Sequence, residues 1–186
     1  MLITFEILAT ACGLTQAVFI MFNKRVNWIF YILQMIFMII FSKMSHLYGD
    51  MINSCVYLII GIISYIMWGI KKNAIKFAST IERINWIIVL VIGTTIGSII
   101  LSKTDDPCNI IDSFTTVSSF IATILMVRRK IDAWIVWFIN DIAYCIEYLI
   151  LPNQAFYLFS LNYIWAAMAV ISFFNWNNIR IREENQ

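Results

Sequence analysis

Seven apolar segments of membrane-spanning length follow one another along this chain of 186 residues, and they constrain its fold more than any other feature. A helix needs about 20 apolar residues to cross the hydrocarbon core of a bilayer. Hydrophobic residues make up 61% of the chain and charged residues 13%, outside the range of soluble domains. The sequence therefore predicts an all-α membrane protein. The expected spans are 4–22, 28–44, 51–70, 84–101, 110–127, 133–151 and 154–176.

The positions of the basic residues predict how the chain is oriented. Lys and Arg are enriched in the cytoplasmic loops of membrane proteins. With the N-terminus outside, only Lys43 and Lys103 fall in outer loops. This bias predicts an N-out, C-in protein of the cell membrane, which requires an odd number of spans. The inner loops and tail then hold Lys24, Arg25, Lys71, Lys72, Lys76, Arg83, Arg128, Arg129, Lys130, Arg180 and Arg182.

An internal repeat links the two halves of the chain. Each half has three spans, a basic loop after the first of them, and the pattern W-x-x-(Y/W)-x-x-(Q/N) at the start of the second. With one span between the halves, both triplets face the same way, so a parallel 3+1+3 arrangement is expected, pseudo-symmetric about an axis along the membrane normal. The expected parts are 1–70, 71–109, 110–176 and a cytoplasmic tail, 177–186. A shift of 106 residues pairs Glu6 with Asp112, Lys24 with Lys130, Trp28 with Trp134, Tyr31 with Trp137, Gln34 with Asn140, and Tyr57 with Tyr163.

The stretch 134–148, WIVWFINDIAYCIEY, is the candidate binding site. On a helix, Trp134, Trp137 and Asp141 fall in one stripe with Tyr144 and Tyr148. Carboxylates within a membrane normally face a protein interior or a wet cavity, and aromatic rings beside them suit a flat, polar ligand, neutral or cationic. Two alternatives are open for Asp141 and Glu147: they are protonated in the empty site, or a cationic substrate balances their charge. The alternative is ordinary helix packing, with amides bonding across helices. The predicted substrate-binding residues are Trp134, Trp137, Asn140 and Asp141, with Gln34, Asn53, Tyr57, Glu147 and Asn162 as second choices.

Other functional classes find less support in the sequence. An intramembrane enzyme needs a nucleophile with a base or clustered metal ligands, whereas the chain has one His in a turn and four dispersed Cys. No cofactor, metal site or nucleic-acid partner is expected; the partners are a small-molecule substrate and the lipid bilayer. A scaffold or sensor that does not transport is the remaining alternative. Trp28, Trp86 and Trp176, near span ends, are expected at the membrane interfaces.

The chain resembles the PnuC family of vitamin transporters. The matching stretches are 26–68, 128–150 and 161–176, and the most specific pieces are LYGD at 47–50 and WIVWFIND at 134–141. The resemblance implies a SWEET-like fold, commonly trimeric, and facilitated diffusion with trapping by a cytoplasmic kinase. Nicotinamide riboside is the implied substrate, with thiamine, riboflavin or deoxynucleosides in relatives. Asp141 stands where the family has Asn or Asp, whereas Glu147 replaces an apolar residue and would also suit thiamine.

Overall fold

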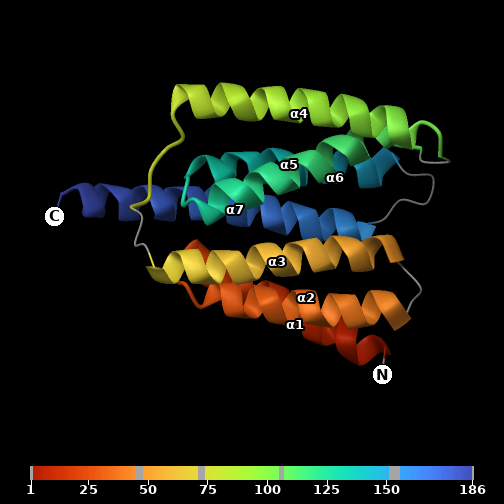
Figure 1. Ribbon diagram of the computed structural model, residues 1–186, viewed down its shortest axis with the longest axis horizontal. Helices are drawn as coiled ribbons and strands as arrows, with labels where there is room; N and C mark the ends of the chain where they lie inside the picture. Colours follow the sequence, from red (N-terminus) through yellow and green to blue (C-terminus); the bar gives the residue numbers. More distant parts are fainter. Residues whose placement is uncertain (1, 45–47, 71–73, 105–106, 151–155, 186) are drawn as a thin grey trace. The chain divides into compact units, whose positions relative to one another are not determined.

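The computed structural model of the chain describes residues 2–44, 48–70, 74–104, 107–150 and 156–185, and these form seven helices (Figure 1). The all-helical fold is confirmed. Every predicted span end lies within four residues of the observed one, except the end of the last helix. In the described part, α1 to α6 are long and apolar enough to cross a bilayer; for α7 the crossing stays a prediction. The helices are α1 Leu2–Met21, α2 Asn27–Met44, α3 Tyr48–Ile70, α4 Thr80–Leu101, α5 Asn109–Val127, α6 Asp132–Ile150 and α7 Phe156–Glu184.

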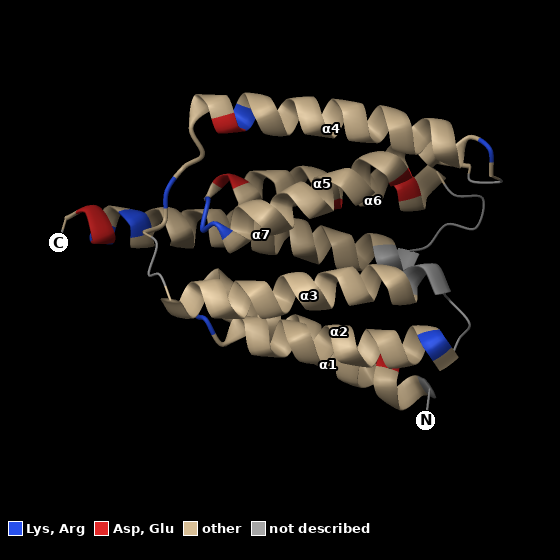
Figure 2. Cartoon of the chain, in the orientation of Figure 1, with Lys and Arg blue, Asp and Glu red and all other residues tan. Residues whose placement is uncertain are grey.

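The chain divides into two compact units, Met1–Asn73 and Ala74–Gln186. In the first unit α2 contacts both α1 and α3, and in the second α5 contacts α4 and α6 while α6 contacts α7. Figure 2 shows Lys and Arg of each unit at helix ends, with no basic residue in the middle of a described helix. This distribution suits helices whose middles lie in hydrocarbon.

The turn that joins α1 to α2 in the first unit and the turn that joins α5 to α6 in the second have the same hydrogen bonds. In the first unit, Asn23 has φ 53° and the N–H groups of Asn23 and Lys24 donate to the carbonyls of Ile20 and Phe19. In the second, Arg129 has φ 54° and the N–H groups of Arg129 and Lys130 donate to Met126 and Leu125. Both are Schellman turns, in which a left-handed residue ends a helix. Every residue of the second turn lies 106 positions after its counterpart in the first.

A pair of tryptophans also recurs in each unit. Trp28 of α2 meets Trp68 of α3 edge to face at 5.5 Å, and Trp134 of α6 meets Trp176 of α7 at 5.4 Å. Trp28 and Trp176 are 1% and 0% exposed. The expectation that these two residues anchor the membrane interfaces is therefore wrong, because each indole packs against a neighbouring helix instead of reaching headgroups.

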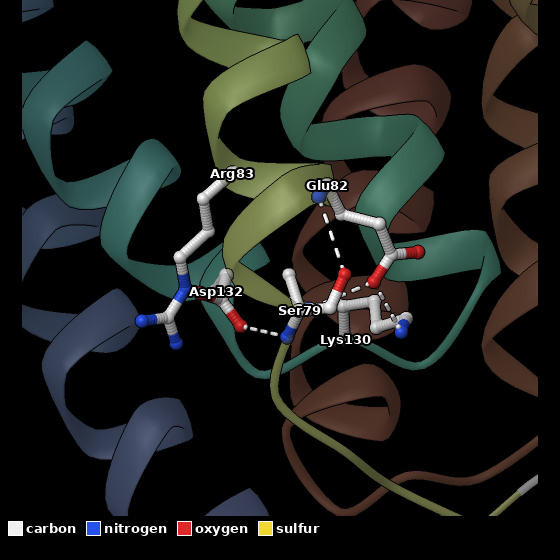
Figure 3. A network of polar contacts seen from close by, with 6 residues as sticks. Ser79, Glu82, Arg83, Lys130 and Asp132 are labelled. Carbon is white, nitrogen blue, oxygen red and sulfur yellow. Dashed lines mark hydrogen bonds and ion pairs between the residues drawn. The ribbon is translucent and has the colours of Figure 1, made fainter.

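Helix α4 begins four residues before its predicted span because of a capping box. The side-chain oxygen of Ser79 accepts from the Glu82 N–H, and the Glu82 carboxylate accepts from the Ser79 N–H. A second contact fixes the same turn, because the Glu82 carboxylate pairs with Lys130 at 2.9 Å. Figure 3 shows these contacts around the start of α4.

Asp132, at the start of α6, holds the segment before α4. Its carboxylate accepts from the Ala78 N–H at 2.6 Å and pairs with Arg83 at 2.7 Å (Figure 3). Lys76 forms a short parallel bridge with Lys130. The beginning of α4 is therefore fastened to the turn between α5 and α6.

The end of α7 extends eight residues beyond its predicted span into the polar tail. Arg180 pairs with Glu184 at 2.9 Å, four residues further along the helix, and the Glu183 carboxylate accepts from the Ile75 N–H at 3.0 Å. Burial lowers the pKa of the Arg129 guanidinium, and the nearby charge of Glu183 partly opposes this. A prediction from hydropathy ends this helix too early, because polar residues form the contacts that extend it.

Replacement of Asp132 by alanine is expected to lower the free energy of unfolding by about 1–3 kcal/mol, because the buried Ala78 N–H loses its acceptor. The half-exposed Arg83 contributes little to this loss, since water can replace its partner. Denaturant unfolding in detergent measures the change. The control is Glu184→Ala, which removes an exposed ion pair and should cost about 0.5 kcal/mol or less. Equal costs for the two variants would contradict the role given to Asp132.

Candidate functional site

Helix α6 has an apolar face and a polar, aromatic face. The six large residues Ile135, Phe138, Ile139, Ile142, Ile146 and Leu149 are all exposed and suit contact with lipid. On the other side of the helix, Asn140 and Asp141 are buried and the remaining polar and aromatic residues are half-buried. The polar stretch that the sequence singled out is thus shielded from lipid, as a membrane carboxylate requires. This face carries Trp137, Asn140, Asp141, Tyr144, Glu147 and Tyr148.

Asn140 and Trp137 present hydrogen-bonding atoms without partners. Asn140 is fully buried, and its amide nitrogen donates to the carbonyl of Thr115 in α5 at 3.3 Å. Its side-chain oxygen and the indole nitrogen of Trp137 are both buried without a hydrogen-bond partner among the described residues. Most buried polar atoms in proteins are satisfied, so an acceptor and a donor left open within one turn indicate a place for a ligand or water.

Asp141 adds a buried carboxylate to the same turn. Its residue is 6% exposed, and none of the ion pairs among the described residues involves it. A charge buried without a counter-ion is costly. A cationic group of a ligand would offset that cost, so this turn of α6 favours a positively charged ring.

Trp134 lies on the same helix but makes a different contact. It is buried, and its ring packs edge to face on Trp176. The corresponding Trp28 makes the same contact in the first unit, which gives Trp134 a role in helix packing. Its indole nitrogen, like that of Trp137, is buried without a hydrogen-bond partner among the described residues, and its predicted contact with substrate stays a prediction. Trp137 is half-buried, and its predicted stacking on a substrate stays a prediction.

Glu147 is half-buried and lies seven residues, about 10 Å, along the helix from Asn140. Between them, Tyr144 stacks on Tyr148, with ring centroids 5.9 Å apart and an angle of 11°. The aromatic stripe therefore continues toward the end of α6. Asn162 of α7 is half-buried as well.

In the first unit, Gln34 and Tyr57 lie in different surroundings. A Cβ atom added at Gly13 of α1 would lie 2.8 Å from the side-chain nitrogen of Gln34, so this amide rests directly on the α1 backbone. Tyr57 meets Tyr31 edge to face at 6.4 Å. Asn53 is exposed. The substrate contacts predicted for these residues stay predictions.

Two features were not predicted from the sequence: the position of Tyr31 beside other aromatic residues, and the different residue spacings within the two tryptophan pairs. Tyr31, which lies between Trp28 and Tyr57, is the repeat counterpart of Trp137, and the repeat itself could have identified it. The tryptophan pairs show a spacing of 106 residues in α2 and α6 but 108 in α3 and α7. A spacing of 108 residues would pair Asn162 with the buried Ser54 and Tyr57 with Trp165, whereas the spacing of 106 pairs Tyr57 with Tyr163; the pairing of these residues stays a prediction.

Bilayer-length helices and a polar face shielded from lipid define a multi-pass membrane protein of the transporter class. Residues 3–178 match the family described as nicotinamide mononucleotide transporter, and the chain belongs to this family. The resemblance stated above is thereby confirmed, as are membrane transport as the function and the cell membrane as the location. Leu47 and the side chains of residues 48–50, from the LYGD motif, lie outside the described residues.

Two relatives agree with this assignment. The chain is 22% identical to the nicotinamide riboside transporter PnuC of Neisseria mucosa, over 96% of this chain and 73% of the relative. It also resembles the crystal structure of the vitamin B3 transporter PnuC, with a TM-score of 0.71 at 19% identity, covering 94% of this chain and 81% of that one. At this identity the structural likeness shows the fold alone.

Proposed function

We propose that this chain carries nicotinamide riboside across the cell membrane by facilitated diffusion with alternating access, and that it converts no substrate chemically. The observation that carries the proposal is the single turn of α6 with an open acceptor on Asn140, an open donor on Trp137 and the uncompensated carboxylate of Asp141. The pyridinium ring is flat, cationic and substituted with an amide. It matches these three groups in charge and in hydrogen bonding.

The residues have separate roles in this proposal. Trp137 stacks on the pyridinium ring, Asp141 balances its charge, and Asn140 bonds a hydroxyl or amide group. Trp134 holds α6 against α7. Gln34, Asn53, Tyr57, Glu147 and Asn162 remain proposed second contacts, and Tyr31 joins them as the counterpart of Trp137.

The proposed topology is two parallel three-helix repeats, α1–α3 and α5–α7, joined by α4. The two Schellman turns 106 residues apart and the two tryptophan pairs support it. The basic loops favour an outer N-terminus and a cytoplasmic C-terminus. A cytoplasmic kinase that traps the product and a homotrimeric assembly complete the proposal and rest on the resemblance to the family.

Thiamine is the second candidate substrate, favoured by the additional carboxylate of Glu147 on the polar side of α6. Its thiazolium ring is cationic, as the pyridinium is, so Asp141 would suit either molecule. The two candidates differ in the group that Glu147 would meet, because the aminopyrimidine of thiamine carries donors for a carboxylate.

Flux into proteoliposomes tests the proposal. With the membrane potential held at zero, the purified chain should admit labelled nicotinamide riboside saturably until the inner and outer concentrations are equal, because a uniporter performs no coupled work. Collapse of a proton or sodium gradient should leave the rate unchanged. Saturable flux of labelled thiamine, with none of nicotinamide riboside, would transfer the assignment to thiamine. Absence of flux for every vitamin and nucleoside tested would leave a scaffold or sensor.

A further inference from the structure

A cavity of about 380 Å³ lies within the second unit, between α4, α5 and α6. Its walls are mainly aliphatic and aromatic, with Ile121 and Leu125 of α5 facing Ile87 and Leu90 of α4. Ile87 is 59% exposed, so the cavity opens at the surface of the unit rather than being enclosed. It shares none of its lining residues with the polar turn of α6 described above.

Helix α4 touches α5 closely at one end. A Cβ atom at Gly93 would lie 3.0 Å from Val117, and one at Gly97 would lie 2.9 Å from Ser113. Small residues four apart allow such close approach of membrane helices. The cavity lies nearer the other end of α4, between Arg83 and Leu90. None of the described residues of α4 is buried, so the side of this helix that is turned away from α5 suits contact with lipid.

The cavity is long enough for part of an acyl chain. Along α5 its lining residues extend from Phe114 to Leu125, about 16 Å, and along α4 and α6 they extend from Arg83 to Leu90 and from Asp132 to Ile139, about 10 Å each. One leaflet of the hydrocarbon core is about 15 Å thick. An acyl chain in the cavity would therefore lie in contact with the protein for much of the depth of one leaflet.

The end of the cavity at the start of α4 carries the guanidinium of Arg83 and the carboxylate of Asp132, which form an ion pair, and the guanidinium of Arg128 lies beside it. Arg83 lines the cavity, and its Nε binds Asp132 while its two terminal nitrogens point away from that carboxylate (Figure 3). Arg128 lies over the ring of Trp86, 5.9 Å from its centroid, and forms no ion pair among the described residues. Trp86 also lines the cavity. Guanidinium groups suit phosphate oxygens, and indoles prefer the level of the headgroups.

We propose that the cavity binds an anionic phospholipid from the leaflet next to the basic loops, with one acyl chain between α4 and α5–α6 and the phosphate on Arg83 and Arg128. Basic pockets between membrane helices bind anionic headgroups in this way. Such a lipid fills the space that the contact at Gly93 and Gly97 leaves between the helices. The site is independent of the substrate and of the transport mechanism.

Native mass spectrometry of the purified chain in detergent tests the proposal, with dioleoyl phosphatidylglycerol and dioleoyl phosphatidylcholine as matched probes. The parent should bind phosphatidylglycerol about tenfold more tightly or better. Arg128→Gln should remove most of this preference and leave phosphatidylcholine binding unchanged, because the acyl contacts remain. Lys103→Gln is the control, since this exposed residue follows the far end of α4; its preference should equal that of the parent.

A second variant tests the acyl chain. Leu90→Trp places a larger side chain in the cavity and should weaken the binding of both lipids about equally. The melting temperature in detergent shows whether the variant is folded. Inorganic phosphate should not compete, because it has no acyl chain. Equal affinity of the parent for the two lipids, or an unchanged preference in Arg128→Gln, would overturn the proposal. A Leu90→Trp variant that alters the oligomeric state but not lipid binding would assign the cavity to a second copy of the chain.

Discussion

Replacing Trp134 by alanine is expected to lower the free energy of unfolding by about 3–5 kcal/mol, as for other buried tryptophans. Its side chain is buried, and the ring packs edge to face on the fully buried Trp176. The surrounding lipid does not compensate, because association of membrane helices depends on van der Waals packing. Denaturant unfolding of the purified protein in detergent measures the loss.

Two further variants give this experiment its controls. Trp28→Ala removes the equivalent ring from the first unit, where it packs on Trp68, and should cost a similar amount. Trp137→Ala removes a half-buried ring, so it should lower the free energy of unfolding much less but weaken substrate binding. If Trp134→Ala were as stable as the parent and failed only in substrate binding, Trp134 would be a ligand contact and its packing role would be wrong.

The helices could be predicted closely from the sequence because their apolar length is set by the bilayer. Helix ends that are set by polar contacts could be predicted less closely from the sequence. The capping box at Ser79 and Glu82 precedes the apolar run of α4, and hydropathy does not register it. Arg129 takes a left-handed conformation that usually belongs to Gly or Asn, so its residue type gave no sign of the turn.

For the candidate site, the helical period of the sequence was sufficient to find the polar face of α6. It could not decide which aromatic residue is free to stack on a ligand. Trp134 and Trp137 lie about one turn apart, and the structure distinguishes them by the contact of Trp134 with Trp176 in α7 and by the greater burial of Trp134. The contacts of the Asp132 carboxylate with Ala78 and Arg83 could not be predicted from the sequence either, because these partners lie 54 and 49 residues away.

Replacing Asp141 by asparagine is expected to lower the affinity for nicotinamide riboside by at least tenfold, while the protein remains folded. The substitution keeps the size of the side chain and removes the carboxyl group whose negative charge would balance the bound cation; none of the ion pairs among the described residues involves Asp141. Two opposite charges about 4 Å apart interact by about 4 kcal/mol at an effective dielectric constant of 20, and tenfold in affinity needs about 1.4 kcal/mol. Calorimetry on the purified protein measures the affinity.

A neutral ligand of the same shape separates charge from geometry. The 1,4-dihydro form of nicotinamide riboside has no pyridinium charge, so parent and Asp141→Asn should bind it about equally. Asp112→Asn, which changes a carboxylate in the first turn of α5, should bind the cationic form like the parent, since charge near a helix start acts mainly on the helix itself. If Asp141→Asn lost both ligands equally, Asp141 would position the site rather than balance a cation. Should it lose neither, the substrate would lie elsewhere than at this turn of α6.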